Sequence, residues 1–197
     1  CHNHLELALL PSVFRKLSQD FPLLRPAIRI VPFPSLLGLV ENQKIHAAFH
    51  IKERQKKSSL YFKELSSAPI ACVCSPEHPL AQYESLTKNM LSGCIIASSP
   101  RQIPDSIFSV QNELLSHLPP DQHYFTENIE SALTLAKAGL GYTLCPDVPL
   151  ARDPGLTYIP ITDLPVLPFG ISCRQDNDHP VLKRFLAICS ETLTLQS

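Results

Sequence analysis

The sequence lacks several features by which a class of protein is often recognised. None of its apolar runs is long enough to cross a membrane. Lysine and arginine (17 residues) do not exceed aspartate and glutamate (18 residues), and the net charge is −1. This balance argues against a nucleic-acid-binding surface, because neutralising phosphates needs clustered positive charge. The single basic run, at residues 52–57, is interpreted as a solvated loop.

Motifs of catalysis are also missing. The chain contains neither Gly-x-Ser-x-Gly nor His-Glu-x-x-His, and with only 6 glycines it has no glycine loop that could cradle a phosphate. Eight histidines could serve as bases, but none accompanies such a motif. The Glu-His-Pro sequence at 77–79 resembles a catalytic group at first sight. The prolines at 76 and 79 favour a crossover with a restricted backbone instead.

The seven cysteines do not form the pattern of a disulfide framework. Their number is odd, and most of them lie in apolar stretches rather than in loops. Cys72 and Cys74 would point to one face of a strand, but a second pair of ligands for a metal ion is missing. The sequence therefore predicts reduced, buried thiols, no metal, no cofactor and a cytoplasmic location.

What the chain does have is an alternation of strand and helix patterns, which is typical of an α/β fold. Its 197 residues suffice for one large domain or two small lobes. Strands are predicted at 27–33, 47–51, 70–74, 94–97, 142–145, 156–160 and 169–173. Helices are predicted somewhere within 3–21, after Pro34, and at 107–118, 129–136 and 181–189. Pro11 lies either inside the first helix or at its start. Asn128 is a predicted N-cap, and Gly139 a predicted C′ residue.

Four stretches together resemble the effector-binding domain of LysR-type transcriptional regulators. They are Leu-Leu-Pro-Ser-Val-Phe at 9–14, Leu-Val-Glu-Asn-Gln-Lys-Ile-His-Ala-Ala at 39–48, Glu-His-Pro-Leu-Ala at 77–81, and Ala-Gly-Leu-Gly at 138–141 followed by Cys-Pro at 145–146. The likeness covers nearly the whole chain, and the last two stretches are its most specific part. The chain departs from the family at His46, where an aspartate is usual. This histidine is either a group that titrates near neutral pH or a tolerated surface change.

The resemblance implies an α/β fold of the type 2 periplasmic-binding-protein-like kind, with two lobes, two crossovers and an interlobe cleft. Lobe I would comprise residues 1–75 and 166–197, and lobe II residues 76–165. The family's first strand and its N-terminal winged helix-turn-helix would lie outside this chain. The resemblance also implies a homo-oligomer, either a dimer or a tetramer, that pairs through the first helix and the helix at 128–138. DNA would be contacted only through the absent N-terminal region.

The resemblance further implies an effector site at strand ends and helix N-termini, where free backbone N–H groups favour anions. The implied effector-binding residues are Asn3, His4, Ser35, His50, Ser98, Ser99, Thr126 and Asn128. Their side chains can form hydrogen bonds, and few lysines or arginines lie nearby, so a small polar or weakly anionic effector is expected. Most of them also have a plainer role: Asn128 as a helix cap, Ser98 and Ser99 as turn residues, His50 as a buried histidine, and Asn3 and His4 as loop residues.

Three functions are therefore compared. The first is an effector-sensing regulatory domain, in which a ligand shifts the relation of the two lobes. The second is a secreted solute-binding protein of a transporter, which the odd number of buried cysteines disfavours. The third is a small-molecule enzyme, which the missing motifs disfavour. A signal peptide before Cys1 would support the second function, whereas a helix-turn-helix there would exclude it.

Overall fold

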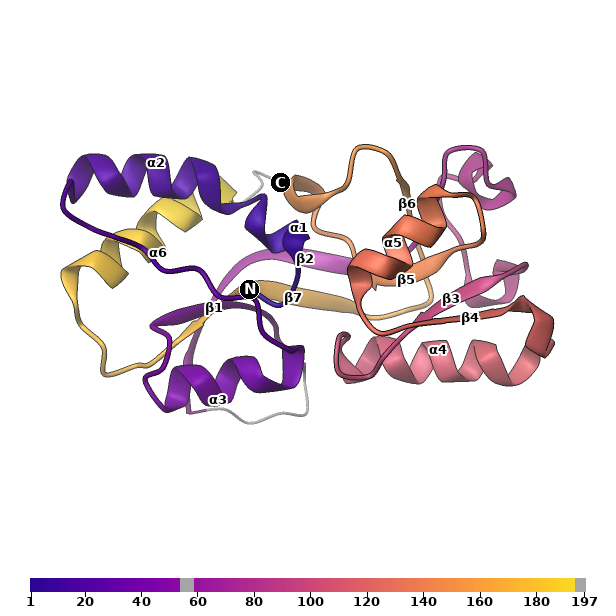
Figure 1. Ribbon diagram of the computed structural model, residues 1–197, viewed down its shortest axis with the longest axis horizontal. Coiled ribbons are helices and arrows are strands. Elements are labelled where there is room, and N and C mark those ends of the chain that lie inside the picture. The colour runs from indigo at the N-terminus through magenta and orange to yellow at the C-terminus, as the bar shows by residue number, and fades with distance from the viewer. Residues whose placement is uncertain (54–58, 194–197) are drawn as a thin grey trace. The chain divides into compact units, whose positions relative to one another are not determined.

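A computed structural model describes residues 1–53 and 59–193 and has a mixed α/β fold, which confirms the predicted fold class (Figure 1). The chain divides into two compact units. Unit 1 comprises Cys1–Ser67 and Pro168–Ser197, and unit 2 comprises Ala68–Leu167. Most of the basic run predicted to be a solvated loop lies outside the described residues.

Unit 1 is built from helices and an antiparallel sheet. Its helices are α1 (His4–Leu7), α2 (Leu10–Asp20), the 3₁₀-helix η1 (Phe33–Ser35), α3 (Leu36–Glu41) and α6 (Pro180–Leu193). Its strands are β1 (Ala47–Ile51), the first half of β2 (Tyr61–Cys74) and most of β7 (Val166–Cys173).

Strand β7 lies between β1 and β2, and it runs antiparallel to β1 from Ala47 opposite Cys173 to Ile51 opposite Phe169. Helices α2 and α6 pack side by side (Figure 1). The buried residues of α2 are Leu10, Val13 and Leu17, whose spacing of three and four places them on one helical face. This apolar stripe anchors the helix to the core of unit 1.

One helix is predicted somewhere within 3–21, and the structure has two helices there. Helix α1 ends at Leu7, and α2 begins at Leu10 with Pro11 in its first turn. Proline has no N–H group and its ring clashes with a preceding helical turn, so it is tolerated only at a helix start. Of the two positions that the sequence allows for Pro11, the structure has the one at the start of a helix.

The predicted strand at 27–33 is not a strand. The Val31 N–H donates to the Cys1 carbonyl at 3.1 Å, and the Cys1 amino group donates to the Arg29 carbonyl at 3.2 Å. The side chains of Ile28 and Ile30 are 51% and 55% exposed. The residues of this stretch are strand-like, but its backbone bonds to Cys1 rather than to a described strand.

Unit 2 holds the remaining elements. Its strands and α-helices are β3 (Ile95–Ser98), α4 (Asp105–His117), β4 (His123–Thr126), α5 (Ile129–Lys137), β5 (Thr143–Pro146) and β6 (Thr157–Pro160). Its 3₁₀-helices are η2 (Pro79–Gln82), η3 (Lys88–Met90), η4 (Pro120–Gln122) and η5 (Pro149–Ala151).

Two small sets of strands form the core of unit 2. Strands β3 and β4 are parallel, and in Figure 1 the pair lies between α4 and α5. Both helices contact β3. Residues 70–74 of β2 pair antiparallel with β5 and with β6. Tyr142 ties β3 to this second set, because its carbonyl accepts from Ile96 at 2.7 Å and its N–H donates to the Cys94 carbonyl at 3.0 Å.

The other predicted elements are present. Their ends differ from the predicted ones by a few residues, and only β2 is much longer than predicted. The sequence predicted only residues 70–74 of this strand, whereas it begins at Tyr61. The missed half contains polar residues and leads to Pro69, which has no N–H group to donate to a ladder. Gly139 is the C′ residue of α5 with φ +76°, as predicted.

Cysteines contribute mainly to the core. All seven are free thiols, and five of them are buried: Cys72, Cys74, Cys145, Cys173 and Cys189. Among the described residues, no helix is long and apolar enough to cross a membrane. The same residues contain no group of three or more His, Cys, Asp or Glu placed to hold a metal ion.

Candidate functional site

Four of the predicted effector contacts lie together at the carboxyl ends of β3 and β4 in unit 2. Ser98 is opposite Thr126 in the parallel register. The Ser99 N–H donates to the Thr126 carbonyl at 3.0 Å, and Thr126 Oγ1 donates to the Ala97 carbonyl at 3.2 Å. Asn128 follows two residues later, at the start of α5. The carboxyl ends of parallel strands are where open α/β sheets bind ligands.

Of the two serines, Ser99 is the one that a ligand can reach. Ser98 is buried and held on both sides by Gln111 of α4. Its N–H donates to Gln111 Oε1 at 2.8 Å, and Gln111 Nε2 donates to its carbonyl at 2.9 Å. The Ser98 hydroxyl is buried, without a partner among the described residues. Ser99 is half-buried, and its Oγ accepts from the Arg101 N–H at 3.4 Å.

Asn128 is the N-cap of α5, as predicted. Its backbone is extended, with φ −146° and ψ 162°, and its Oδ1 accepts from the Ser131 N–H at 2.8 Å. This bond satisfies one of the N–H groups that a helix leaves unpaired at its start. The Nδ2 group is not part of the cap, and Asn128 is half-buried. The amide can therefore cap the helix through its oxygen and donate to a ligand through its nitrogen.

The predicted contacts of unit 1 are His50 of β1, Ser35 of η1, and Asn3 and His4 at the start of α1. The Phe33 ring stacks on His50 of β1, with ring centroids 5.7 Å apart, and meets His2 edge-on at 5.1 Å. His2 in turn contacts Asn3, the residue before His4. Ser35 is exposed at the end of η1, two residues after Phe33. The buried Phe33 ring thus links the segment that carries Asn3 and His4 to the strand that carries His50.

A closed set of contacts joins His2, Asn3 and Glu6 at the start of α1. The Glu6 N–H donates to Asn3 Oδ1 at 3.0 Å, and Asn3 Nδ2 lies 2.9 Å from His2 Nε2. Glu6 Oε2 accepts from the His2 backbone N–H at 2.8 Å, and Glu6 Oε1 lies 2.7 Å from His2 Nδ1. All three residues are more than nine-tenths buried. Asn3 is therefore the N-cap of α1, with both ends of its amide in contact with protein groups.

The carboxylate of Glu6 is charged although it is 4% exposed. Burial alone would raise its pKa, but the electrostatic effect of the His2 imidazole and the hydrogen bonds from His2 together lower the pKa below the ordinary value for glutamate. Unit 1 therefore keeps a buried negative charge beside the predicted contacts Asn3 and His4.

Sequence reasoning missed four residues that shape these two groups: His2, Glu6, Phe33 and Gln111. A signal for Glu6 was available. Asn3-x-x-Glu6 has the spacing of a capping box, in which the acidic residue reaches back to the start of the helix. Here the carboxylate accepts from the residue before the cap, His2, instead of from the cap itself. Gln111 carries no such signal, because a lone glutamine in an amphipathic helix is ordinary.

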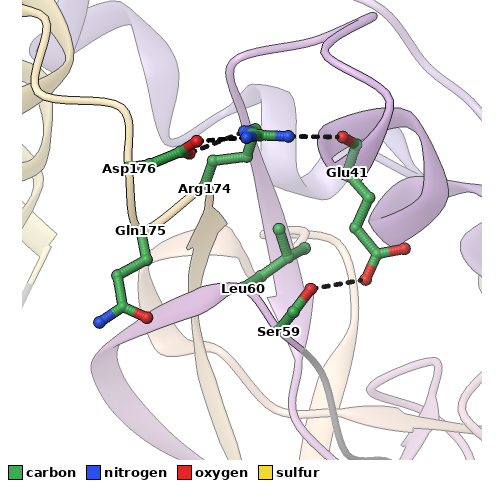
Figure 2. Close-up of a pocket in the computed structure, with 6 residues that line it drawn as sticks. All are labelled: Glu41, Ser59, Leu60, Arg174, Gln175 and Asp176. Carbon is green, nitrogen blue, oxygen red and sulfur yellow. Dashed lines mark hydrogen bonds and ion pairs between the residues drawn. The ribbon is translucent and has the colours of Figure 1, made fainter.

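One pocket of about 450 Å³ lies within unit 1, and Figure 2 shows the six residues that line it: Glu41, Ser59, Leu60, Arg174, Gln175 and Asp176. None of the predicted effector contacts lines this pocket. The Arg174 guanidinium pairs with the Asp176 carboxylate through two nitrogens, and a third nitrogen donates to the Glu41 carbonyl at 3.1 Å. Because its positive charge is already balanced, Arg174 does not make this pocket an anion site.

Comparisons with known proteins agree on one family. A family model described as the LysR substrate binding domain matches residues 1–194. The effector binding domain of a BenM variant is similar to this chain with a TM-score of 0.74 and 19% identity, over 96% of this chain and 90% of that one. The BenM effector binding domain with its effector benzoate has a TM-score of 0.71 and 19% identity, over 99% of this chain and 92% of that one.

A third similar structure is the regulatory domain of MetR, a LysR family regulator from N. meningitidis. Its TM-score is 0.66 and its identity 20%, over 98% of this chain and 89% of that one. This chain spans 64% of full-length BenM, with a TM-score of 0.71 and 20% identity. No curated protein matches the chain.

Proposed function

The chain belongs to the LysR substrate binding domain family and is the effector-binding regulatory domain of a LysR-type regulator, and we propose that its effector is a small polar or weakly anionic molecule. The observation that carries this proposal is the group of polar side chains at the carboxyl ends of β3 and β4. Ser99, Thr126 and Asn128 lie there on neighbouring segments, held by backbone bonds. Hydroxyl and amide groups can bind a carboxylate or a hydroxyl of a ligand without a full opposite charge.

We propose that the effector also contacts unit 1, through His4 and His50, with Ser35 and Asn3 nearby. The reason is thermodynamic. A ligand changes the balance between two arrangements of a protein only if it binds one of them better than the other. An effector that contacted a single unit would bind equally well in every arrangement of the two units, and so would transmit no signal.

Binding is tested by a thermal-shift screen of small polar and carboxylated compounds, followed by calorimetry with the compound that stabilises the chain. Ser99→Ala should weaken the binding of that compound by about 0.5–1.5 kcal/mol, because one hydrogen bond is lost. Ser92→Ala is the matched control, since Ser92 is an exposed serine of the same unit outside the site. Equal affinities in the wild type, in a Ser99/Asn128 double alanine variant and in a His4/His50 double alanine variant would reject the proposed site.

Other properties follow from the family and stand as parts of the same proposal. The protein acts as a homo-oligomer in the cytoplasm and is not an enzyme. It binds DNA through residues outside this chain. The buried thiols suit a reducing compartment. Sedimentation of the chain at high concentration tests the oligomer. A monomer throughout would contradict it.

A further inference from the structure

The contacts among His2, Asn3 and Glu6 determine which nitrogen of the His2 ring carries the proton. The Glu6 backbone N–H can only donate, so the Asn3 atom that faces it at 3.0 Å is the amide oxygen. The other end of the amide, Nδ2, is then a donor, and it lies 2.9 Å from His2 Nε2. This nitrogen must accept, so it carries no hydrogen. The ring is neutral, with its single proton on Nδ1, 2.7 Å from Glu6 Oε1.

A second proton on His2 is incompatible with this arrangement. Protonated Nε2 would place its N–H against the donor Nδ2 of Asn3. A half-turn of the Asn3 amide would relieve the conflict by offering Oδ1 to the ring, but the same turn removes the acceptor from the Glu6 N–H. A charged His2 and the Asn3 cap of α1 therefore exclude one another. Because α1 has only four residues, the Asn3 cap contributes a large share of the stability of this helix.

We propose that His2 and Glu6 are positioning residues of the effector site and that protonation of His2 releases the Asn3 cap and loosens His4. This inference rests on the proposed function, which gives His4 its role. The device requires that His2 can take up a proton although it is 8% exposed. The site in unit 1 would thus become less ordered as pH falls.

Other titrating groups face this cluster. His50 stacks on the opposite side of the Phe33 ring, at 5.7 Å between centroids. Glu6 is the charged neighbour on α1. An experiment on His2 must therefore separate its own titration from that of His50.

The test is nuclear magnetic resonance of the whole 197-residue chain, labelled with ¹⁵N, across a range of pH. At alkaline pH the His2 ring should show its proton on Nδ1. As the ring becomes charged, the Glu6 amide proton should shift and exchange faster with water, and the ring signals of His4 should shift at the same midpoint. A proton on Nε2 at alkaline pH would overturn the inference. The inference would also be overturned if the shift and the exchange rate of the Glu6 amide proton did not change as His2 becomes protonated.

Asn3→Asp separates this coupling from a merely structural role. A carboxylate has two acceptor oxygens, so it can bond the Glu6 N–H and a protonated His2 Nε2 together. In this variant His2 should keep its second proton to higher pH than in the wild type, and the Glu6 amide should stay bonded throughout. Asn42→Asp is the matched control, because it adds the same charge at an exposed residue of unit 1. Equal His2 titrations in the two variants would reject the proposal.

None of these measurements uses an effector. Their failure would leave the proposed function standing, while failure of the calorimetric test on Ser99 would leave the His2 result intact.

Discussion

Two glycines in this chain occupy places where no side chain fits. A Cβ atom on Gly141 would lie 2.2 Å from the Cys94 carbonyl oxygen, and one on Gly170 would lie 2.1 Å from the Lys63 carbonyl oxygen. Both obstacles are backbone atoms, which cannot rotate away as the end of a side chain can. These glycines therefore permit close approach of two backbone segments, in unit 2 and unit 1 respectively.

Gly141→Ala should lower the free energy of unfolding by about 1–3 kcal/mol, because the backbone must shift and a φ of +157° disfavours alanine. Urea denaturation measures this change. Gly38→Ala is the control. Gly38 lies in α3 with nothing within 4 Å of the added Cβ, so alanine should be neutral or stabilising there. Equal stabilities for the two variants would show that the close approach to Cys94 is absent.

The lowered pKa of Glu6 has a consequence for stability against pH. In the window between the ordinary pKa of glutamate and the lower pKa of folded Glu6, the unfolded chain binds more protons than the folded one. Stability from Glu6 is therefore fully present above the ordinary pKa and is lost as pH falls through the folded pKa. Glu6→Gln should remove this contribution, along with about 1–3 kcal/mol of stability at neutral pH from the broken contacts.

The effect of Glu6→Gln is measured from denaturant midpoints between roughly pH 3 and 7, a range that contains the ordinary pKa of glutamate. The wild type should lose more stability on acidification than the variant does. Glu84→Gln, at an exposed glutamate of unit 2, should follow the wild type. A variant Glu6→Gln with the acid sensitivity of the wild type would mean that the buried carboxylate is not stabilised by His2.

Among the elements, α5 shows how a cap and a ligand contact can share one residue. Asn128→Ala should lower stability by about 1 kcal/mol, because the Ser131 N–H loses its acceptor. Asn128→Asp should keep the cap and lose only the Nδ2 donor. Melting temperature measured beside effector affinity separates the two roles. If Asn128→Asp binds the effector as tightly as the wild type does, the amide nitrogen is not a contact.

Local signals account for the elements that the sequence predicted well. Asn128 and Gly139 mark the two ends of α5, because one or two residues are enough to cap a helix. The predicted strand 47–51 matches β1, because a short and mostly apolar run of residues is typical of a buried strand. Non-local partners account for the failures. The stretch 27–33 has a strand pattern, but its backbone bonds to Cys1, which no pattern within 27–33 reveals.

The candidate site shows the same division. The unit 2 contacts were implied by the family resemblance, which puts strand ends and the start of a helix at the site, and the register of β3 and β4 brings Ser98 and Thr126 together. The ring of contacts among His2, Asn3 and Glu6 was not predicted. It depends on burial, which makes the pairing of a carboxylate and an imidazole obligatory. Only the spacing Asn3-x-x-Glu6 hinted at it.

At the scale of the whole molecule, the proposal makes a claim about both units that hydrogen exchange can test. An effector at 100 times its Kd stabilises a one-site protein by about 2.7 kcal/mol. If the effector contacts both units, slower exchange should appear at the ends of β3 and β4 in unit 2 and also at α1 and β1 in unit 1.

The compound found in the thermal-shift screen serves as the ligand in this measurement, and the Ser99→Ala variant at the same ligand concentration is the control. Weaker binding in the variant should reduce the protection in both units together, since one ligand causes both effects. Protection confined to unit 2 would show that the effector binds there alone. Such a ligand would have no differential affinity for arrangements of the two units, and the signalling role proposed for His4 and His50 would have to be given up.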